Sequence, residues 1–410
     1  MRGSSPEEPE RQEDTVGRVA IIGYAATPVG RLQPKPGETA PLEHEVLADI
    51  VLRAVVMAQV DKSEIGGLSF AQPRPYTQQK YFGTFMASYL KLPCDGFVAE
   101  VLGNGMTGGL AFEHAADNIR SGRAKVALAL GINYETAVTS AEHMMSSMRA
   151  VGDVDFQAPF GITPIAWYAM DMMRYMHEFG VTREDVASVA VKNRFHASLN
   201  PLAQYRTLTS LDEVMDQPMI VHPLGLYEVP PRSDGAVALV LADEDVARAS
   251  GRPYVVVRGS GFHHEGAHQI TSTPNDMIAL NAAQRAGSAA FEEAGLTPSD
   301  LDFAEPYAPC TIVEVLVSEA LGIVPRGAGA RFAAEGRTTL GGDIPISTSG
   351  GLTSRGHPAY VTPLYNLLEA VEQLMHRAGD RQVVDAAIGL TTAELGNYNA
   401  ALVHVLERIS

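Results

Sequence analysis

Hydrophobic positions in this chain form short runs of strand length, separated by stretches in which apolar residues have helical spacing. The run at residues 19–24 is apolar and rich in β-branched residues, which predicts a buried strand. Residues 42–60 then show the periodicity of one helix face. The same order of strand, loop and helix returns at residues 254–259 and 277–294. The pattern therefore predicts an internal repeat.

The second part of each repeat is predicted to be a glycine-rich turn, a helix and a strand. In the first copy, Gly-Gly-Leu at 108–110 begins a helix that leads to a strand at 126–131. In the second copy, Gly-Gly-Leu at 350–352 precedes a helix at 364–375 and a strand at 383–389. Alternating strands and helices indicate parallel sheets covered by helices. A duplicated unit of this size predicts two similar layers that pack back to back.

These repeats divide the chain into two predicted halves, preceded by a short tail. Residues 1–16 are polar and acidic and are predicted to be disordered. The N-terminal half is predicted to span 17–254, including an insertion at 136–226, and the C-terminal half to span 255–410.

The insertion at 136–226 is rich in methionine and aromatic residues. A helix is predicted at 164–179 with Gly180 as its C-cap, and Thr182 is predicted to be the N-cap of the next helix. The methionines either fill a core or form an adaptable apolar wall for a bulky substrate. They are Met144, Met145, Met148, Met170, Met172, Met173 and Met176.

Charge narrows the range of functions. The chain has 410 residues, with 31 basic against 48 acidic side chains and a formal net charge of −17. Nucleic acids and anionic membranes require a basic face, so neither is expected as the main partner. No apolar run reaches the eighteen residues of a transmembrane helix, and the chain begins without the apolar core of a signal peptide.

Two cysteines and a histidine cluster are the obvious candidates for redox or metal chemistry. Cys94 and Cys310 are too few for a disulfide scaffold or a cysteine-rich zinc site, so a reducing cytoplasm is expected. His263, His264 and His268 form a cluster that either binds metal or lies in a loop near the substrate entrance. The loop interpretation is preferred, because glycines surround the cluster and no carboxylate is placed to join it.

Three motifs together carry a family resemblance. They are Glu-Phe-Gly-Val-Thr-Arg-Glu-Asp at 178–185, Ser-Asp-Gly-Ala at 233–236 and Ser-Gly-Gly-Leu-Thr-Ser-Arg-Gly-His-Pro at 349–358. With them, residues 17–406 resemble a thiolase, most closely the sterol-carrier-protein-X and lipid-transfer-protein branch, which includes steroid side-chain-cleaving aldolases. The resemblance implies an α/β fold of two duplicated halves in five layers (αβαβα), a homodimer, and a coenzyme A thioester as substrate, with no further cofactor.

The chain departs from this family at both catalytic cysteines. A thiolase carries its nucleophilic cysteine at a helix N-terminus, where the helix dipole lowers the thiol pKa. The corresponding segment at 101–109 places Gly105 at or near that position, and Cys94 lies eleven residues earlier. The second family cysteine corresponds to a position near Ala393. Condensation or thiolysis through an acyl-cysteine is therefore not expected, although a backbone N–H near Gly105 could still act as an oxyanion donor.

The remaining motif residues suit the stabilisation of a thioester enolate. His357, on the turn that begins at Gly356, resembles the family histidine that faces the thioester oxygen. Tyr307 replaces the family's asparagine or histidine, and Tyr360 follows His357 by three residues. We predict that the two tyrosines handle protons, although the reference pKa near 10 means that a tyrosine base needs a hydrogen-bonding or cationic neighbour. Glu394 lies beside the lost acid/base position and is a further catalytic candidate.

These residues favour retro-aldol cleavage of a bulky β-hydroxyacyl-CoA to a ketone and a shortened acyl-CoA. Two alternatives stay open: acyl transfer by an atypical nucleophile, Cys310, and a binding or scaffold subunit that has lost catalysis. Arg232 and Lys192 are candidate contacts for the phosphates of coenzyme A. The resemblance also makes an OB-fold, zinc-ribbon acyl-CoA-associated protein a plausible partner.

Overall fold

The structure is a computed structural model of the whole chain. It describes residues 17–32, 39, 41–71, 79–136, 142, 146, 148–265 and 276–410. The predicted tail at 1–16, His268, Met144 and Met145 lie outside the described residues.

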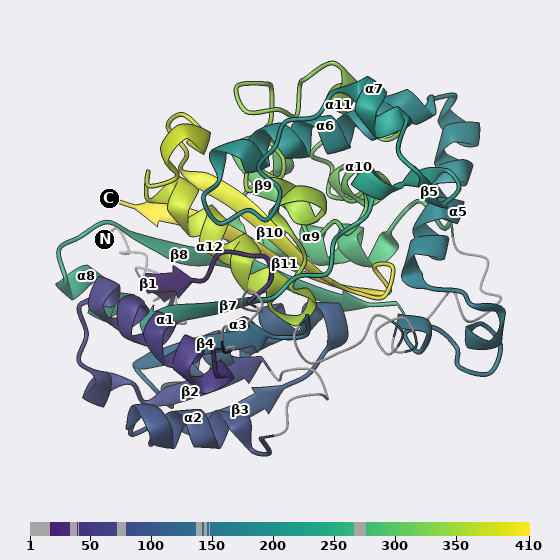
Figure 1. The fold of residues 1–410 in the computed structure, drawn as a ribbon. Coiled ribbons are helices and arrows are strands. Elements are labelled where there is room, and N and C mark those ends of the chain that lie inside the picture. Colours follow the sequence, from purple (N-terminus) through teal and green to yellow (C-terminus); the bar gives the residue numbers. More distant parts are fainter. Residues whose placement is uncertain are drawn as a thin grey trace, which may run out of the picture.

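A nine-stranded sheet runs through the molecule in the order β3-β2-β4-β7-β1-β8-β11-β10-β9 (Figure 1). Its strands are β1 (Val19–Ala26), β2 (Gly67–Ala71), β3 (Phe97–Val101), β4 (Val126–Asn133), β7 (Gly235–Asp243), β8 (Tyr254–His264), β9 (Phe303–Glu305), β10 (Ile388–Leu395) and β11 (Ala400–Ile409). Most positions of the central strands are buried because helices cover both faces of the sheet, which explains their continuous apolar runs.

The strand topology repeats itself and confirms the internal repeat. In the first half, β1 pairs antiparallel with β7, β7 pairs antiparallel with β4, and β4 pairs parallel with β2. In the second half, β8, β11, β10 and β9 are connected in the same sequence of antiparallel, antiparallel and parallel pairs. A short antiparallel pairing of β1 with β8 joins the two halves.

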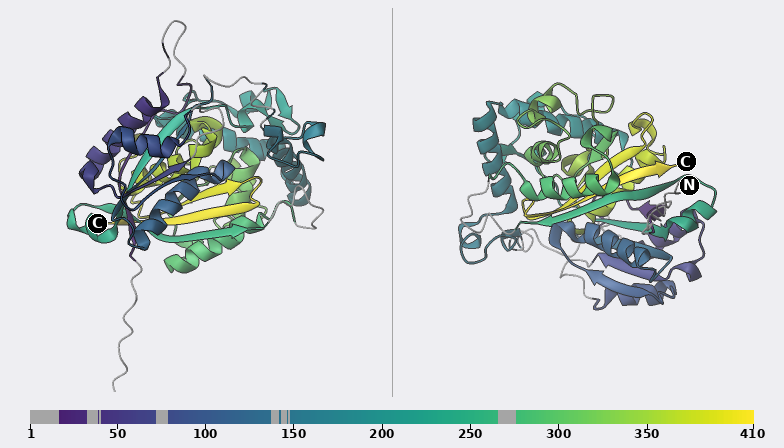
Figure 2. Two further views of the ribbon diagram at one scale, coloured as in Figure 1. Left: turned by 90° about the horizontal axis from the view of Figure 1, so that it is seen from below. Right: turned by 180° about the vertical axis from the view of Figure 1, so that it is seen from behind.

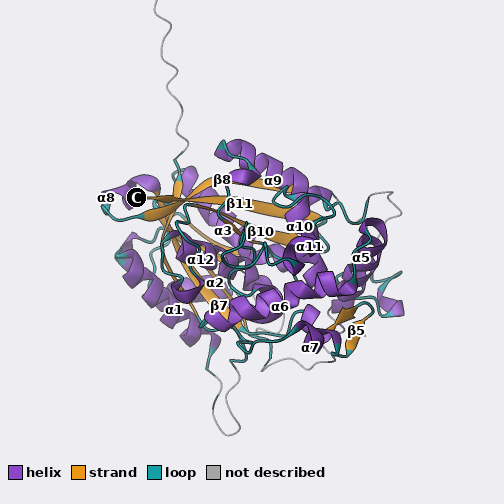
Figure 3. Cartoon of the chain, turned by 90° about the horizontal axis from the view of Figure 1, so that it is seen from above, coloured by secondary structure: helices purple, strands orange, loops and turns teal. Residues whose placement is uncertain are grey.

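Helices complete a five-layer arrangement around the two halves of the sheet (Figure 3). One outer layer contains α1 (Glu43–Ala58) and α2 (Phe82–Leu90), the middle layer contains α3 (Thr107–Arg120) and α12 (Thr362–Leu374), and the other outer layer contains α9 (Asn281–Ala294) and α10 (Thr311–Ala320). The middle helices contact each other as well as the sheet. No helix in the described part of the chain has the length and apolar character needed to cross a membrane.

The insertion lies to one side of the layers, against the C-terminal half (Figure 2). It contains α5 (Pro164–Phe179), α6 (Arg183–Leu199), α7 (Leu211–Met215), β5 (Met219–Val221) and β6 (Leu224–Gly225). The helix predicted at 164–179 is confirmed, with Gly180 left-handed at φ 60° as its C-cap. Thr182 is confirmed as the next N-cap, because its hydroxyl accepts a hydrogen bond from the backbone N–H of Asp185.

One detail of the predicted repeat is wrong. The strand predicted at 383–389 begins only at Ile388. Val383 is buried but lies outside any strand, and the turn that follows it includes Asp385 with a left-handed φ of 53°. The helix predicted after Gly-Gly-Leu at 350–352 is confirmed: residues Gly351–Arg355 form one π-helical turn, and α12 starts at Thr362, close to the predicted 364. Two further short helices are α8 (Glu244–Ala249), in the N-terminal half, and α11 (Gly329–Ala334), in the C-terminal half.

Candidate active site

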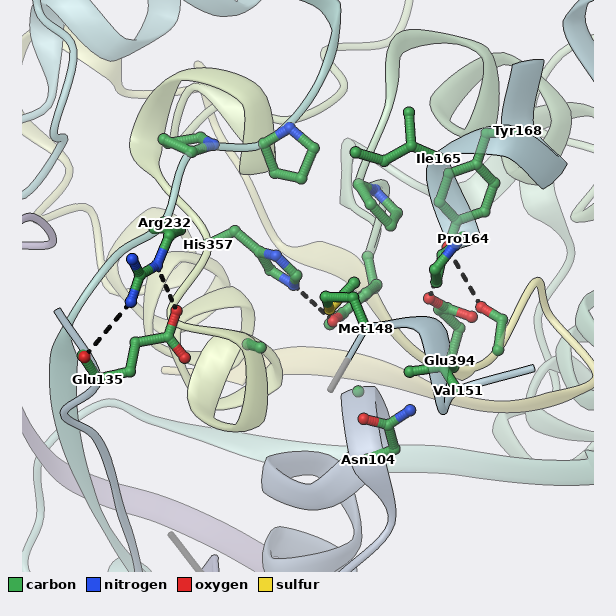
Figure 4. Close-up of a pocket in the computed structure, with 17 residues that line it drawn as sticks. Asn104, Glu135, Met148, Val151, Pro164, Ile165, Tyr168, Arg232, His357 and Glu394 are labelled. Carbon is green, nitrogen blue, oxygen red and sulfur yellow. Dashed lines mark hydrogen bonds and ion pairs between the residues drawn. The ribbon is translucent and has the colours of Figure 1, made fainter. Parts of the chain in front are cut away.

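A cavity of about 270 Å³ opens where the two halves meet the insertion (Figure 4). Most of its wall is apolar, with polar groups gathered at a few points. Its lining residues are Asn104, Gly105, Glu135, Met148, Val151, Pro164, Ile165, Tyr168, Pro230, Pro231, Arg232, Tyr307, Pro309, His357, Ala359, Glu394 and Gly396. Four of the predicted site residues, Gly105, Tyr307, His357 and Glu394, therefore lie together.

The centre of the site is a contact between Tyr307 and His357. The hydroxyl oxygen of Tyr307 and Nε2 of His357 lie 2.7 Å apart, and the two rings are nearly perpendicular. The backbone of Tyr307 is held on both sides: its N–H donates to the hydroxyl of Thr392 at 2.8 Å, and its carbonyl accepts from the hydroxyl of Tyr398 at 2.6 Å. A phenol and an imidazole are thus fixed at hydrogen-bonding distance facing the cavity.

The turn that carries His357 is fixed by the Ser-Asp-Gly-Ala motif. The backbone N–H of His357 donates to the hydroxyl of Ser233 at 2.9 Å. Gly356 has a left-handed φ of 109°, and a Cβ there would lie 2.5 Å from Val29 and 2.9 Å from the hydroxyl of Ser233. Only glycine fits this position without displacing its neighbours. The two sequence motifs therefore act together to position one imidazole.

Gly105 lies directly against Tyr307, just before the N-terminus of α3. A Cβ at Gly105 would lie 2.9 Å from the hydroxyl oxygen of Tyr307 and 2.9 Å from the carbonyl oxygen of Glu394. Real Cβ atoms do not approach other heavy atoms this closely. The phenol of Tyr307 thus fills space that a side chain at Gly105 would need, so the two residues are structurally linked.

Glu394 is a buried carboxyl at the end of β10. Burial raises its pKa to about 8, although hydrogen bonds to its ionised form oppose the shift. Its oxygens accept from the backbone N–H of Tyr398 at 3.1 Å and from the hydroxyl of Tyr168 at 3.5 Å. At pH 7 the carboxyl is mainly neutral and is therefore suited to donate a proton.

The insertion contributes to the site through α5. The hydroxyl of Tyr168 also donates to the carbonyl of Gly396 at 3.2 Å, and Asp171, one turn later, accepts from the amide of Asn397 at 2.5 Å. Burial raises the pKa of Asp171 to about 7. These contacts connect residues 226 to 228 positions apart. Sequence analysis missed both residues, because helical spacing does not reveal which distant loop a helix will contact.

An ion pair lies on the opposite side of the cavity from Glu394 and Tyr168 (Figure 4). Nε of Arg232 is 3.8 Å from a carboxylate oxygen of Glu135, and an arginine N–H donates to the Glu135 carbonyl at 3.5 Å. About one third of the Arg232 side chain is exposed (33%), whereas Glu135 is buried. Glu135 and Asn104 were also missed. The available signal was that Glu135 follows β4 by two residues, at the sheet end where sites commonly form.

Two further sequence predictions gain no support from the arrangement of the cavity. Tyr360 is not among the described residues that line it, and its role as a second proton-handling tyrosine stays a prediction. Lys192 was wrongly placed as a phosphate contact: it is buried, pairs with Glu314 and donates to the carbonyl of Ile346 at 2.9 Å. Its charge is therefore already compensated inside the protein.

Acyl transfer by Cys310 and metal binding by the histidine cluster also lack a supporting geometry. Cys310 is buried outside the cavity lining, and burial together with nearby carboxylates raises the pKa of its thiol well above the ordinary value, which disfavours a reactive thiolate. His263 and His264 are successive residues of β8, so their side chains point to opposite faces of the strand. Among the described residues, no group of three or more metal-ligating side chains converges.

Comparison with known proteins agrees with the fold. A family model described as "Thiolase C-terminal domain-like" matches residues 264–408. An acetyl-CoA acetyltransferase of Methanothermobacter thermautotrophicus is 33% identical over 95% of this chain and 99% of its own length. The steroid side-chain-cleaving aldolase of Thermomonospora curvata is 28% identical over 94% of this chain and 97% of its own.

A solved structure, the Ltp2-ChsH2(DUF35) aldolase, has a TM-score of 0.78 and 27% identity and covers 95% of this chain and 98% of the other. A duplicated five-layer fold around a cavity with the Gly-His-Pro turn defines a thiolase-like protein. Human sterol carrier protein 2 is 28% identical over 94% of this chain and 71% of its own. With these relatives, the chain belongs to the thiolase superfamily.

Proposed function

We propose that this protein cleaves a bulky β-hydroxyacyl-CoA by a retro-aldol reaction, giving a ketone and a shortened acyl-CoA. The observation that carries the proposal is the pairing of Tyr307 with His357 at the place where Gly105 leaves no room for a nucleophile. A retro-aldol step needs acid/base groups and an oxyanion donor but no acyl-enzyme, and these are the groups that the cavity offers.

The proposed reaction begins with the Tyr307–His357 pair, which takes the proton of the β-hydroxyl group. The Cα–Cβ bond then breaks: the hydroxyl-bearing carbon becomes the carbonyl carbon of the ketone, and the bonding electrons pass to the thioester as an enolate. An N–H of the histidine ring or of the backbone near Gly105 stabilises the enolate oxygen.

The reaction ends when Glu394 donates its proton to Cα of the enolate. Its pKa of about 8 supports this role, because the carboxyl is protonated at neutral pH and can be reprotonated afterwards. The Tyr307–His357 pair then releases to water the proton that it took from the substrate hydroxyl, and Glu394 takes up a proton from water. No oxidant, metal or free coenzyme A is therefore consumed.

The proposed substrate carries a bulky apolar acyl group. The cavity wall supplies Met148, Val151, Ile165 and several prolines, which suit an apolar ligand. Arg232, which is partly exposed at the same cavity, is the proposed contact for a coenzyme A phosphate.

We also propose a homodimer and a partner of the OB-fold, zinc-ribbon type. The solved aldolase that pairs Ltp2 with ChsH2(DUF35) supports a two-component assembly, and a benzoylsuccinyl-CoA thiolase of Thauera aromatica, 29% identical in one subunit, supports it as well.

The test is turnover of tertiary β-hydroxyacyl-CoA thioesters, steroid and simpler branched, without free coenzyme A. The protein is assayed alone and with a co-encoded OB-fold partner, and the ketone and the shortened thioester are quantified together. Equimolar release supports the aldolase. Tight acyl-CoA binding with no turnover by either preparation would instead identify a binding subunit. A stable mass increase of the protein after exposure to acyl-CoA would identify an acyl transferase.

A further inference from the structure

A second cavity, of about 300 Å³, lies at the seam between the two halves. Three guanidinium groups line it: Arg252 precedes β8, Arg377 follows α12, and Arg408 lies near the end of β11. The β1 strand supplies Tyr24 to the same cavity. Residues far apart in the sequence thus bring three positive charges together in a protein whose net charge is −17.

These charges are not balanced by the cavity wall. None of the described residues that line this cavity carries a carboxylate. Two acidic groups act near the cavity: Glu372 pairs with Arg381 and also attracts Arg377, which offsets part of that charge, and Glu244 accepts a hydrogen bond from Tyr254 at 3.0 Å. The cavity is therefore a local region of positive potential.

The three arginines differ in how many of their guanidinium N–H groups have a hydrogen-bond partner. Arg377 bonds to the hydroxyl of Tyr24, and Arg252 donates to the carbonyls of Met57 and Ala58 at 3.3 Å and 2.9 Å. Nε of Arg252 and Nε of Arg408 are nevertheless buried with no hydrogen-bond partner among the described residues. The Arg408 side chain as a whole has no described ion pair or hydrogen bond. The outer guanidinium N–H groups of Arg408 have no described partner either, so an anion in the cavity would satisfy donors that the described residues leave unmatched.

The cavity is separate from the candidate active site. Strand β11 starts beside Glu394, whose pairing partner is Ala401, and runs to Arg408. Seven residues of extended strand at ~3.3 Å each place Arg408 roughly 23 Å from the reacting centre. An acyl-CoA bound at the active cavity therefore does not account for these arginines.

We propose that this cavity binds the phosphate group of a small molecule, either free phosphate or a phosphate monoester. Guanidinium groups bind phosphate oxygens through paired hydrogen bonds, and Arg408 has its donors available for them. The hydroxyls of Tyr24 and Ser250 add polar contacts, and Ile21, Met57 and Met375 form an apolar surface against which an organic group can pack. Because the lining comes from both halves, bound phosphate would connect them across the seam.

The test is calorimetric titration of the full-length protein with inorganic phosphate and, separately, with adenosine monophosphate. We expect at least one of the two probes to bind saturably. Arg408→Gln and Arg377→Gln should each weaken this binding at least tenfold. Two variants are used because Arg408 is partly buried, whereas Arg377 is exposed and its replacement leaves the core intact. Tighter binding of the nucleotide than of inorganic phosphate identifies a monoester as the ligand.

Arg174→Gln is the matched control, because it removes one exposed arginine that lines neither cavity and leaves the seam unchanged. It should bind both probes as the unaltered protein does. The proposal is overturned if neither probe binds at millimolar concentration, if the two seam variants bind as well as the unaltered protein, or if Arg174→Gln weakens binding as much as the seam variants do.

Discussion

Gly105 and Tyr307 compete for the same space at the reacting centre, and this competition explains how the site differs from one with a nucleophilic cysteine. A cysteine at 105 would force its Cβ within 2.9 Å of the Tyr307 hydroxyl. The missing thiol was visible in the sequence, but its structural consequence was not, because nothing local to 101–109 indicates that residue 307 faces it. The contact depends on how the two halves pack.

Gly105→Ala should destabilise the protein by about 1–3 kcal/mol and reduce activity, because the added methyl group overlaps Tyr307 and the Glu394 backbone. Urea unfolding and turnover measure the two effects. Gly30→Ala is the control, since a Cβ there meets nothing within 4 Å, and it should change stability by less than about 0.5 kcal/mol. Equal stability of the two variants would show that the space at Gly105 is free.

Tyr307→Phe keeps the ring and removes the hydroxyl that faces His357. We expect kcat to fall by about 10²- to 10⁴-fold, the usual contribution of a positioned acid/base group, while acyl-CoA binding is retained. Tyr175→Phe removes a buried hydroxyl that bonds to Glu319 outside the cavity, so it should leave kcat unchanged. A Tyr307→Phe variant as active as Tyr175→Phe would remove this residue from the mechanism.

Activity should fall as pH rises through about 8, because Glu394 then loses the proton that it donates. The free energy of unfolding should also fall as pH rises, over the range below about pH 8, because the same carboxyl loses its proton. The folded pKa is raised above that of the unfolded chain, so the native state binds more protons, and stability decreases from about pH 4.5 up to about pH 8. Glu394→Gln should abolish the alkaline limb of the activity profile together with most of the activity, and urea unfolding at pH 6 and pH 9 should show a smaller difference than in the unaltered protein. A pH profile unchanged by the substitution would contradict the assignment.

Individual helices and strands were the most predictable level of the molecule. The helices at 164–179 and after Thr182 were predicted from apolar spacing and capping residues, which act locally and are therefore readable from sequence. The strand at 383–389 was misplaced because Val383 is buried without being in a strand. An apolar residue indicates that its position is buried, but it does not by itself indicate a strand.

The insertion helix α5 gives a test at this scale, because one of its tyrosines contacts Glu394 and another does not. The hydroxyl of Tyr168 stabilises the ionised form of Glu394, so Tyr168→Phe should raise the Glu394 pKa further and move the alkaline limb of activity to higher pH. Tyr175→Phe, in the same helix, should leave the limb in place because its hydroxyl contacts Glu319. A shift in both variants would indicate a general change of α5 rather than a specific contact.

At the scale of the whole molecule, buried ion pairs connect elements that the sequence could not place together. Lys192 of α6 pairs with Glu314 of α10, so an apparent phosphate ligand is instead a link between the insertion and the C-terminal half. The hydrophobic pattern and the family resemblance predicted the duplicated fold, since the resemblance extends over nearly the whole chain. They did not predict these links, because each depends on the packing of two particular side chains.

Lys192→Met should destabilise the protein by about 3–5 kcal/mol, because it leaves Glu314 buried without its counter-charge. Adding Glu314→Gln to the same protein should recover part of that loss, since the unpaired charge is then removed. Chemical unfolding of the two single variants and the double variant measures the coupling. Purely additive losses would mean that the pair does not link the two elements energetically.

The central claim is that a carbon–carbon bond is broken without an acyl-enzyme, and one paired incubation tests it most directly. The protein, with its partner if one is required, receives a β-hydroxyacyl-CoA without free coenzyme A, and in parallel the matching β-oxoacyl-CoA with free coenzyme A. We predict that the hydroxy compound alone is converted, with ketone and shortened acyl-CoA in a 1:1 ratio. Cleavage of the oxo compound with consumption of free coenzyme A would identify thiolysis and contradict the account.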